Sequence, residues 1–132
     1  MDRPLRKARD RASASGVSVT WIRGDVTKLQ AAGLQPGFSL FFDRGCFHGL
    51  NEGQRALYAS GVTELAAPGA TLLLMAFAPN NVLVAPTGVD EAEVARTFAG
   101  WELTSSAADS GPAPAGPMRD VLRRWYRLRR RA

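Results

Sequence analysis

The chain has 132 residues, of which 45% are apolar and 22% charged, with a formal net charge of +5 and one cysteine. These values predict one folded domain and exclude a disordered chain, and the lone cysteine excludes an internal disulfide. The longest apolar run, residues 65–79, is interrupted by Pro68 and Gly69 and is too short to span a bilayer. The first residues lack the apolar core of a secretory signal, so we expect a cytoplasmic protein without a membrane segment.

The positive charge lies at the two ends of the sequence. Seven arginines and a single acid, Asp120, lie from Arg119 onward, and residues 2–11 form a weaker basic cluster. The rest of the chain is close to neutral. A high isoelectric point that arises from the ends alone is weak evidence for nucleic-acid binding, so we do not expect a nucleic-acid partner.

The first part of the chain predicts a helix followed by two strands. Residues 3–14 are rich in Arg, Lys and Ala and are followed by Gly16, which predicts a helix with a glycine stop. Residues 17–22 (VSVTWI) alternate in polarity and predict a strand, which a turn and a short helix to Ala32 follow. Residues 38–42 (FSLFF) are apolar on both faces, which predicts a strand buried in the centre of a sheet.

The following elements alternate between helix and strand. Residues 51–66 predict a helix that Pro68-Gly69 ends, and its apolar face consists of Leu57, Tyr58, Gly61, Val62 and Leu65. A buried strand, a short acidic helix, a further strand and a Gly/Pro-rich loop then follow, at residues 70–77, 90–99, 101–107 and 108–117. This alternation predicts a parallel α/β sheet with right-handed crossovers.

The polar segment DRGCFHGL, residues 43–50, follows the predicted central strand. It contains the only cysteine of the chain, Cys46, and the only histidine, His48. In parallel α/β sheets, ligands bind outside the carboxyl ends of the strands. We therefore expect the ligand crevice at this segment.

Several longer stretches match a known family at roughly its spacing. They are VSVTWIRGDVTKL, FSLFFDRGCFHGL, YASGVTELAAPGATLLLMAFAP and WYRLRR, and together they span most of residues 3–130. They resemble class I S-adenosylmethionine-dependent methyltransferases, of the small bacterial kind related to the thiopurine and tellurite-resistance enzymes. FDRGCFHGL is the most specific part of the resemblance. The implied fold is a Rossmann-like sheet that ends in an antiparallel hairpin, and the implied cofactor is S-adenosylmethionine.

The resemblance also implies roles for residues after two of the strands. Asp25 and Val26 match the positions that hold the adenine, and Asp43, Arg44 and Gly45 match the segment along the cofactor's methionine arm. Phe47 and His48 then face a small-molecule methyl acceptor, and His48 is the candidate catalytic base if the acceptor arrives protonated.

The sequence departs from the family at its amino-terminal side. It lacks a match to the first strand, the glycine-rich cofactor loop, the first helix and the second strand. Residues 1–132 are thus expected to form an incomplete methyltransferase domain, with a helix (1–16), an α/β core (17–107), a loop (108–117) and a last strand with a basic tail (118–132). Open sheet edges then favour self-association, and we expect methyl transfer to be impaired or absent in this truncated chain.

Other interpretations of the same residues remain open. Asp25 is also a suitable cap for the short helix that follows it, and His48 is also suited to packing or capping. Cys46 is expected to be a small buried apolar residue rather than a nucleophile. With one His and one Cys, the sequence predicts no metal site.

The carboxyl-terminal segment MRDVLRRWYRLRRR has two competing interpretations. Val121, Trp125 and Leu128 recur at helical spacing, which predicts a basic amphipathic helix. The resemblance implies instead a last antiparallel strand with its aromatic side chains packed inward, which we favour. A non-catalytic binding module, in which Arg119–Arg131 bind an acidic partner or RNA, is the alternative to an enzyme.

Overall fold

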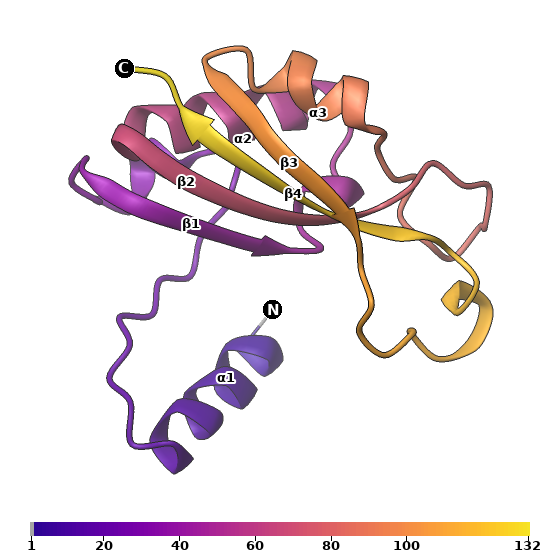
Figure 1. Ribbon diagram of the computed structural model, residues 1–132. Helices are drawn as coiled ribbons and strands as arrows, with labels where there is room; N and C mark the ends of the chain where they lie inside the picture. Colours follow the sequence, from indigo (N-terminus) through magenta and orange to yellow (C-terminus); the bar gives the residue numbers. More distant parts are fainter. Residues whose placement is uncertain (1) are drawn as a thin grey trace.

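A four-stranded mixed sheet with helices against one face forms the body of the computed structural model, which describes residues 2–132 (Figure 1). The helices are α1 (Asp2–Ala14), α2 (Glu52–Leu65) and α3 (Glu91–Thr97). The strands are β1 (Phe38–Arg44), β2 (Ala66–Phe77), β3 (Trp101–Ala108) and β4 (Arg123–Arg130). Short 3-10 turns are present at η1 (Leu29–Ala32), η2 (Phe47–Gly49) and η3 (Gly116–Met118).

The strands lie in the order β1-β2-β4-β3. β1 and β2 are parallel and joined through α2, whereas β4 runs antiparallel to both β2 and β3. The expected α/β sheet that ends in an antiparallel hairpin is therefore present. The carboxyl-terminal segment is a strand, so the helical interpretation of its periodicity is wrong.

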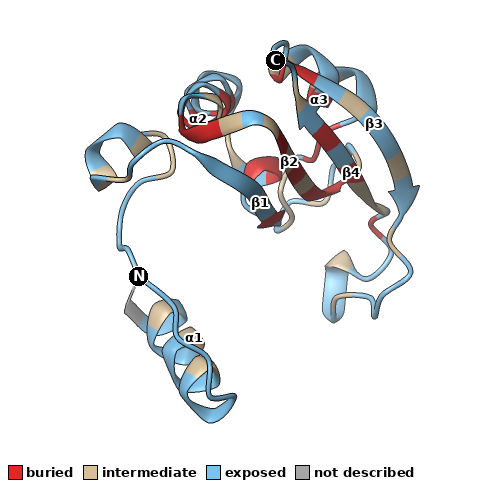
Figure 2. Cartoon of the chain, turned by 60° about the vertical axis from the view of Figure 1, so that its left-hand side comes forward, coloured by how far each residue is buried: buried red, intermediate tan, exposed pale blue. Residues whose placement is uncertain are grey.

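The core lies between the sheet and the helices α2 and α3. Alternate residues of the two central strands point into it, and Leu72, Leu74 and Leu128 are fully buried there. In Figure 2, β2 is largely buried whereas β1 is mostly exposed. The prediction that residues 38–42 are buried on both faces is wrong, because β1 is an edge strand whose Leu40 and Phe42 are 58% and 64% exposed.

The strand predicted at residues 17–22 is also wrong. Within residues 2–132 this segment pairs with no strand, and Val17 and Val19 are 56% and 46% exposed. Figure 1 shows it as a single extended linker between the sheet and α1, which stands apart from the sheet. Alternating polarity favours an extended chain, but a strand forms only where a neighbour takes up its backbone hydrogen bonds.

Two details of α2 also differ from the predictions. The helix ends at Leu65 and β2 begins directly at Ala66, so Pro68-Gly69 lies within the strand and does not end the helix. Leu57, which the spacing places on the buried face, is 55% exposed. At the start of the helix, Asn51 and Gln54 form a reciprocal capping box, which fixes where the helix leaves the η2 turn.

Candidate functional site

A cleft of about 580 Å³ lies at the carboxyl ends of the parallel strands β1 and β2. Its floor is formed by residues at the ends of the two strands and in the η2 turn, namely Arg44 at the end of β1, Gly45 after it, Met75 and Phe77 at the end of β2, and His48. Val84 and Pro86 form one wall, and the loop that leads to β4 forms the other. The cleft occupies the edge of the sheet at which the sequence predicted a ligand crevice.

Asp43 fixes the turn that follows β1. It is 6% exposed, and its carboxylate accepts hydrogen bonds from the backbone N–H of Cys46 (2.8 Å) and Phe47 (3.1 Å) and from the hydroxyl of Tyr58 (2.6 Å). Burial and the Asp43 charge raise the pKa of Tyr58 well above its usual value, so this hydroxyl remains a donor. The Asp43 side chain thus lies on the core side of β1 and not in the cleft.

Gly45 lets the chain turn sharply at the floor of the cleft. Its φ is +94°, a conformation that side chains with a Cβ rarely adopt, and its N–H donates to the Met75 carbonyl at 3.2 Å. A Cβ at this position would lie 3.3 Å from Nε2 of His48. Glycine therefore suits this position, because the φ is positive and the imidazole lies close to the backbone.

His48 is 4% exposed, and its ring lies against Phe77 at the edge of the cleft. Its Nδ1 accepts a hydrogen bond from the Phe77 N–H at 2.8 Å, so the neutral ring has its proton on Nε2. Burial lowers the pKa of the imidazole, and the Asp43 charge offsets part of that shift. This tautomer donates from Nε2 toward Gly45, an arrangement that does not suit a general base.

Phe47 points away from the cleft. Its ring is fully buried and packs against Tyr58 and Phe98, with ring centroids 5.5 and 5.3 Å apart. The sequence placed Phe47 beside the acceptor, but the structure places it in the core behind His48. Cys46 is exposed, so the expectation of a buried cysteine is wrong, and desolvation followed by the Asp43 charge raises the pKa of its thiol.

Asp25 and Val26 lie on the linker that precedes η1. The Asp25 carboxylate accepts hydrogen bonds from the N–H (2.9 Å) and hydroxyl (2.7 Å) of Thr27, and these bonds lower its pKa. Val26 and Leu29 pack against the core, and Leu29 fits closely over Gly61 of α2, where a Cβ would lie 3.1 Å from it. This packing anchors the loop, but neither Asp25 nor Val26 lines the cleft.

A second set of polar residues orders the wall formed by the loop before β4. Asp109 accepts a hydrogen bond from Nε1 of Trp125 at 3.0 Å and forms an ion pair with Arg123 at 3.2 Å. Arg123 also donates to the carbonyls of Pro112 (2.8 Å) and Gly111 (3.1 Å). The Trp125 bond, followed by smaller effects that include Arg123, lowers the pKa of Asp109. Sequence reasoning missed this group because its members lie far apart in the chain.

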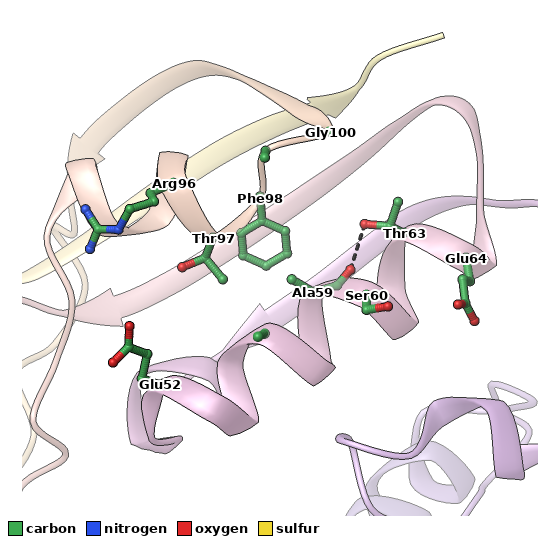
Figure 3. Close-up of a pocket in the computed structure, with 11 residues that line it drawn as sticks. Glu52, Ala59, Ser60, Thr63, Glu64, Arg96, Thr97, Phe98 and Gly100 are labelled. Atoms are coloured by element: carbon green, nitrogen blue, oxygen red, sulfur yellow. Dashed lines mark hydrogen bonds between the residues drawn. The ribbon is translucent and has the colours of Figure 1, made fainter.

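Another hollow, of about 510 Å³, lies between α2 and the segment from α3 to β3 (Figure 3). Glu52 and Arg96 lie toward one end of it and Thr63 toward the other. The Thr63 hydroxyl donates to the Ala59 carbonyl and accepts from Nε1 of Trp101, so its hydrogen bonds are made within the protein. This hollow lies on the helical side of the molecule, away from the carboxyl ends of the strands where such folds bind ligands. We therefore place the candidate site at the cleft.

Two further kinds of site have no support in the part of the chain that the structure describes. No three His, Cys, Asp or Glu side chains of residues 2–132 gather as metal ligands would. Nor does any described helix have both the length and the apolar character needed to cross a bilayer.

Comparisons with solved structures identify the fold. The N-methyltransferase NodS from Bradyrhizobium japonicum WM9, solved with S-adenosyl-L-homocysteine, is 14% identical over 98% of this chain and 63% of its own, with a TM-score of 0.74. TehB from Haemophilus influenzae is 14% identical over 100% of this chain and 48% of its own, with a TM-score of 0.71.

A third neighbour is the 1,6-didemethyltoxoflavin-N1-methyltransferase from Burkholderia thailandensis, solved with 1,6-didemethyltoxoflavin and S-adenosylhomocysteine. It is 16% identical over 94% of this chain and 56% of its own, with a TM-score of 0.70. The chain thus spans less than two thirds of the length of each of these three structures. At such identities the likeness is one of fold: this chain forms part of a Rossmann-like methyltransferase sheet.

The sequence itself identifies the family. A search of curated proteins finds no significant match. The sequence profile of the thiopurine S-methyltransferase family, however, matches residues 3–131, which is nearly the whole chain. The chain therefore belongs to the thiopurine S-methyltransferase family of S-adenosylmethionine-dependent methyltransferases.

Proposed function

We propose that this protein transfers the methyl group of S-adenosylmethionine to a small-molecule acceptor bound in the cleft. The observation that carries the proposal is the position of the cleft at the carboxyl ends of β1 and β2, in a chain of a methyltransferase family. Its volume of about 580 Å³ is in the range of sites that bind small molecules. The lone exposed thiol of Cys46 fits the reducing cytoplasm that we propose as its location.

The chemistry that we propose requires alignment more than proton transfer. The acceptor's electron pair forms the new bond to the methyl carbon, and the pair of the broken C–S bond returns to the cofactor's sulfur. His48 holds its proton on Nε2 because the Phe77 N–H occupies Nδ1, and that proton is directed toward Gly45, so in this proposal the imidazole shapes the floor of the cleft. The acceptors that suit this cleft are those with an available electron pair.

The predicted site residues divide into three groups in this proposal. Arg44, Gly45 and His48 line the cleft and border the methionine arm and the acceptor. Asp43 and Phe47 act from the core side, where they fix the turn that carries His48. Asp25 and Val26 remain our candidates for the adenine, on the anchored loop before η1.

We further infer that the chain on its own binds the cofactor weakly. Residues 17–22 pair with no strand among the described residues, and β1 is an edge strand beside the cleft, so no sheet neighbour holds Asp25 against the cleft. The open edge also favours self-association, because its free N–H and C=O groups pair readily with another strand.

Calorimetric titration with S-adenosylhomocysteine tests the site. We expect Asp25→Ala to abolish binding, whereas Thr27→Ala, which removes a hydroxyl that bonds to the same carboxylate, should leave it unchanged. The short helix after Asp25 begins after Lys28 without a side-chain cap, so capping is not the role of Asp25; if the residue serves only its local turn with Thr27, both variants should bind as the wild type does. Absence of binding to the wild-type chain, at any concentration that remains soluble, would refute a cofactor site in the chain as it stands.

The second candidate is a binding module for an acidic partner or RNA. The observation in its favour is that Arg127, Arg129 and Arg131 are exposed on and beyond β4, and Arg129 and Arg131 line a shallow hollow of about 440 Å³. Binding of this kind should weaken steeply as salt rises, whereas cofactor binding should change little. Fluorescence anisotropy with labelled single-stranded RNA, at two salt concentrations, separates the two functions.

A further inference from the structure

One buried arginine outside the cleft joins three separate segments of the chain. Arg55, in the first turn of α2, is 6% exposed. Its Nε donates to the Phe47 carbonyl at 3.3 Å, and its Nη2 donates to the carbonyls of His48 (2.9 Å) and Gly88 (3.2 Å). Its Nη1 forms an ion pair with Glu93 of α3. The guanidinium thus uses its planar fork on three carbonyls and a carboxylate at once.

Two of the segments that Arg55 holds are parts of the cleft. Phe47 and His48 belong to the η2 turn, whose imidazole lines the floor. Gly88 ends the loop whose Val84 and Pro86 form a wall. The distance between this floor and this wall therefore depends on one guanidinium group.

The backbone of Phe77 shows how closely the two parts are coupled. Its N–H donates to Nδ1 of His48 at 2.8 Å, and its carbonyl accepts from the Val89 N–H at 2.9 Å. Gly88 has a φ of +82°, and a Cβ there would lie 2.3 Å from the Ala78 carbonyl oxygen, so the 84–88 loop packs directly on the end of β2 with no room for a side chain at this position. The end of β2 thus lies between the His48 turn and the backbone at Gly88 and Val89, and Arg55 joins these two segments on the core side.

We propose that Arg55 is a positioning residue for the methyl-transfer cleft, which sets the spacing of the His48 turn and the 84–88 loop and so determines how tightly ligands bind. This inference rests on the proposed function of the cleft. Arg55 does not line the cleft, and it acts through the carbonyls of its partners. Shifts of about 1 Å in such supports reduce catalysis by as much as about 100-fold.

The variants that test the proposal are Arg55→Lys and, as a matched control, Glu93→Gln. A lysine retains the charge and the contact with Glu93, but its point charge does not bridge three carbonyls in one plane. Glu93→Gln removes the ion pair and leaves the three carbonyl bonds intact. We expect Arg55→Lys to weaken S-adenosylhomocysteine binding at least tenfold, and Glu93→Gln to change it by less than about twofold.

A second readout does not depend on ligand binding. The ¹⁵N shifts of the His48 ring report its tautomer, and hydrogen exchange of the Phe77 amide reports the bond to Nδ1. In Arg55→Lys, well below its melting temperature, we expect mixed tautomers and at least tenfold faster exchange, while Glu93→Gln retains the wild-type signals. If Arg55 contributes only to global stability, the Phe77 exchange rate should rise in both variants in proportion to their loss of stability.

The outcomes separate the two proposals. If Arg55→Lys is folded and retains both the wild-type affinity and the wild-type His48 signals, the positioning role is refuted. If the wild-type chain binds no cofactor, the proposed function fails, while the His48 and Phe77 signals still decide whether Arg55 fixes the turn.

Discussion

The carboxylate of Asp43 gives the sharpest test of how the site is built. Asp43→Ala removes the acceptor of three hydrogen bonds, from the N–H groups of Cys46 and Phe47 and from the Tyr58 hydroxyl. The Phe47 N–H and the Tyr58 hydroxyl lie in the buried core, where an unpaired donor costs about 1–3 kcal/mol each, whereas the Cys46 N–H regains water. We therefore expect a loss of about 4 kcal/mol in the free energy of unfolding.

Tyr58→Phe is the matched control, because it removes one donor and leaves the carboxylate paired with two others. A single hydrogen bond to a charged group accounts for about 1.5 kcal/mol. Urea denaturation followed by tryptophan fluorescence gives both values from the transition midpoints. The reasoning is refuted if Asp43→Ala costs no more than Tyr58→Phe, since Asp43 would then not hold the turn.

Three further predictions concern the cleft and the open edge. Burial lowers the pKa of His48, so the unfolded chain binds the imidazole proton more readily than the folded one. The melting temperature should therefore fall as the pH drops below about 6.5, and His48→Gln should flatten that pH dependence. Gly88→Ala should lower the melting temperature sharply, whereas Gly100→Ala, where a Cβ has open space, should change it little; equal effects would contradict the packing at Gly88. Leu40→Lys should reduce self-association in a sedimentation concentration series, while Leu122→Lys, which is also exposed but lies off β1, should not.

The sequence predicted the order of the elements well wherever apolar runs were long. β1 and β2 are strands near their predicted positions, and the helix between them carries most of its predicted buried face. The local pattern of residues 17–22 is that of a strand, and nothing in it shows that the prediction is wrong. A strand does not form there because no neighbouring strand among the described residues pairs with this backbone. Strand pairing depends on the whole sheet, so the alternation of residues within one segment does not predict whether that segment has a partner.

The direction of the site residues was less predictable, although one signal existed. Side chains alternate across a strand, so Asp43 shares the face of Phe41, which packs on the core, whereas Arg44 shares the face of Phe42. Alternation along β1 is therefore enough to place Asp43 on the core face and Arg44 on the opposite one. The bonds of Arg55 to Gly88 and Glu93 join residues more than 30 positions apart in the chain, so no local sequence pattern predicts them.

The same parity distinguishes the two interpretations of the carboxyl-terminal segment. Tyr126 and Leu128 are buried, while Arg127 and Arg129 are exposed, which is a period of two. The helical spacing of Val121, Trp125 and Leu128 is therefore coincidental. In a short basic segment both periods fit a few positions, and the neighbouring strands β2 and β3 decide between them.

The position of β4 in the sheet has a consequence for synthesis of the protein. β4 lies between β2 and β3 but follows both of them in the chain, so neither strand acquires that neighbour until β4 leaves the ribosome. Until then β3 has no partner among the described strands, and the edge of β2 that β4 later covers has unpaired backbone N–H and C=O groups. We therefore expect aggregation to compete with folding mainly in the interval before β4 is synthesised and the sheet closes.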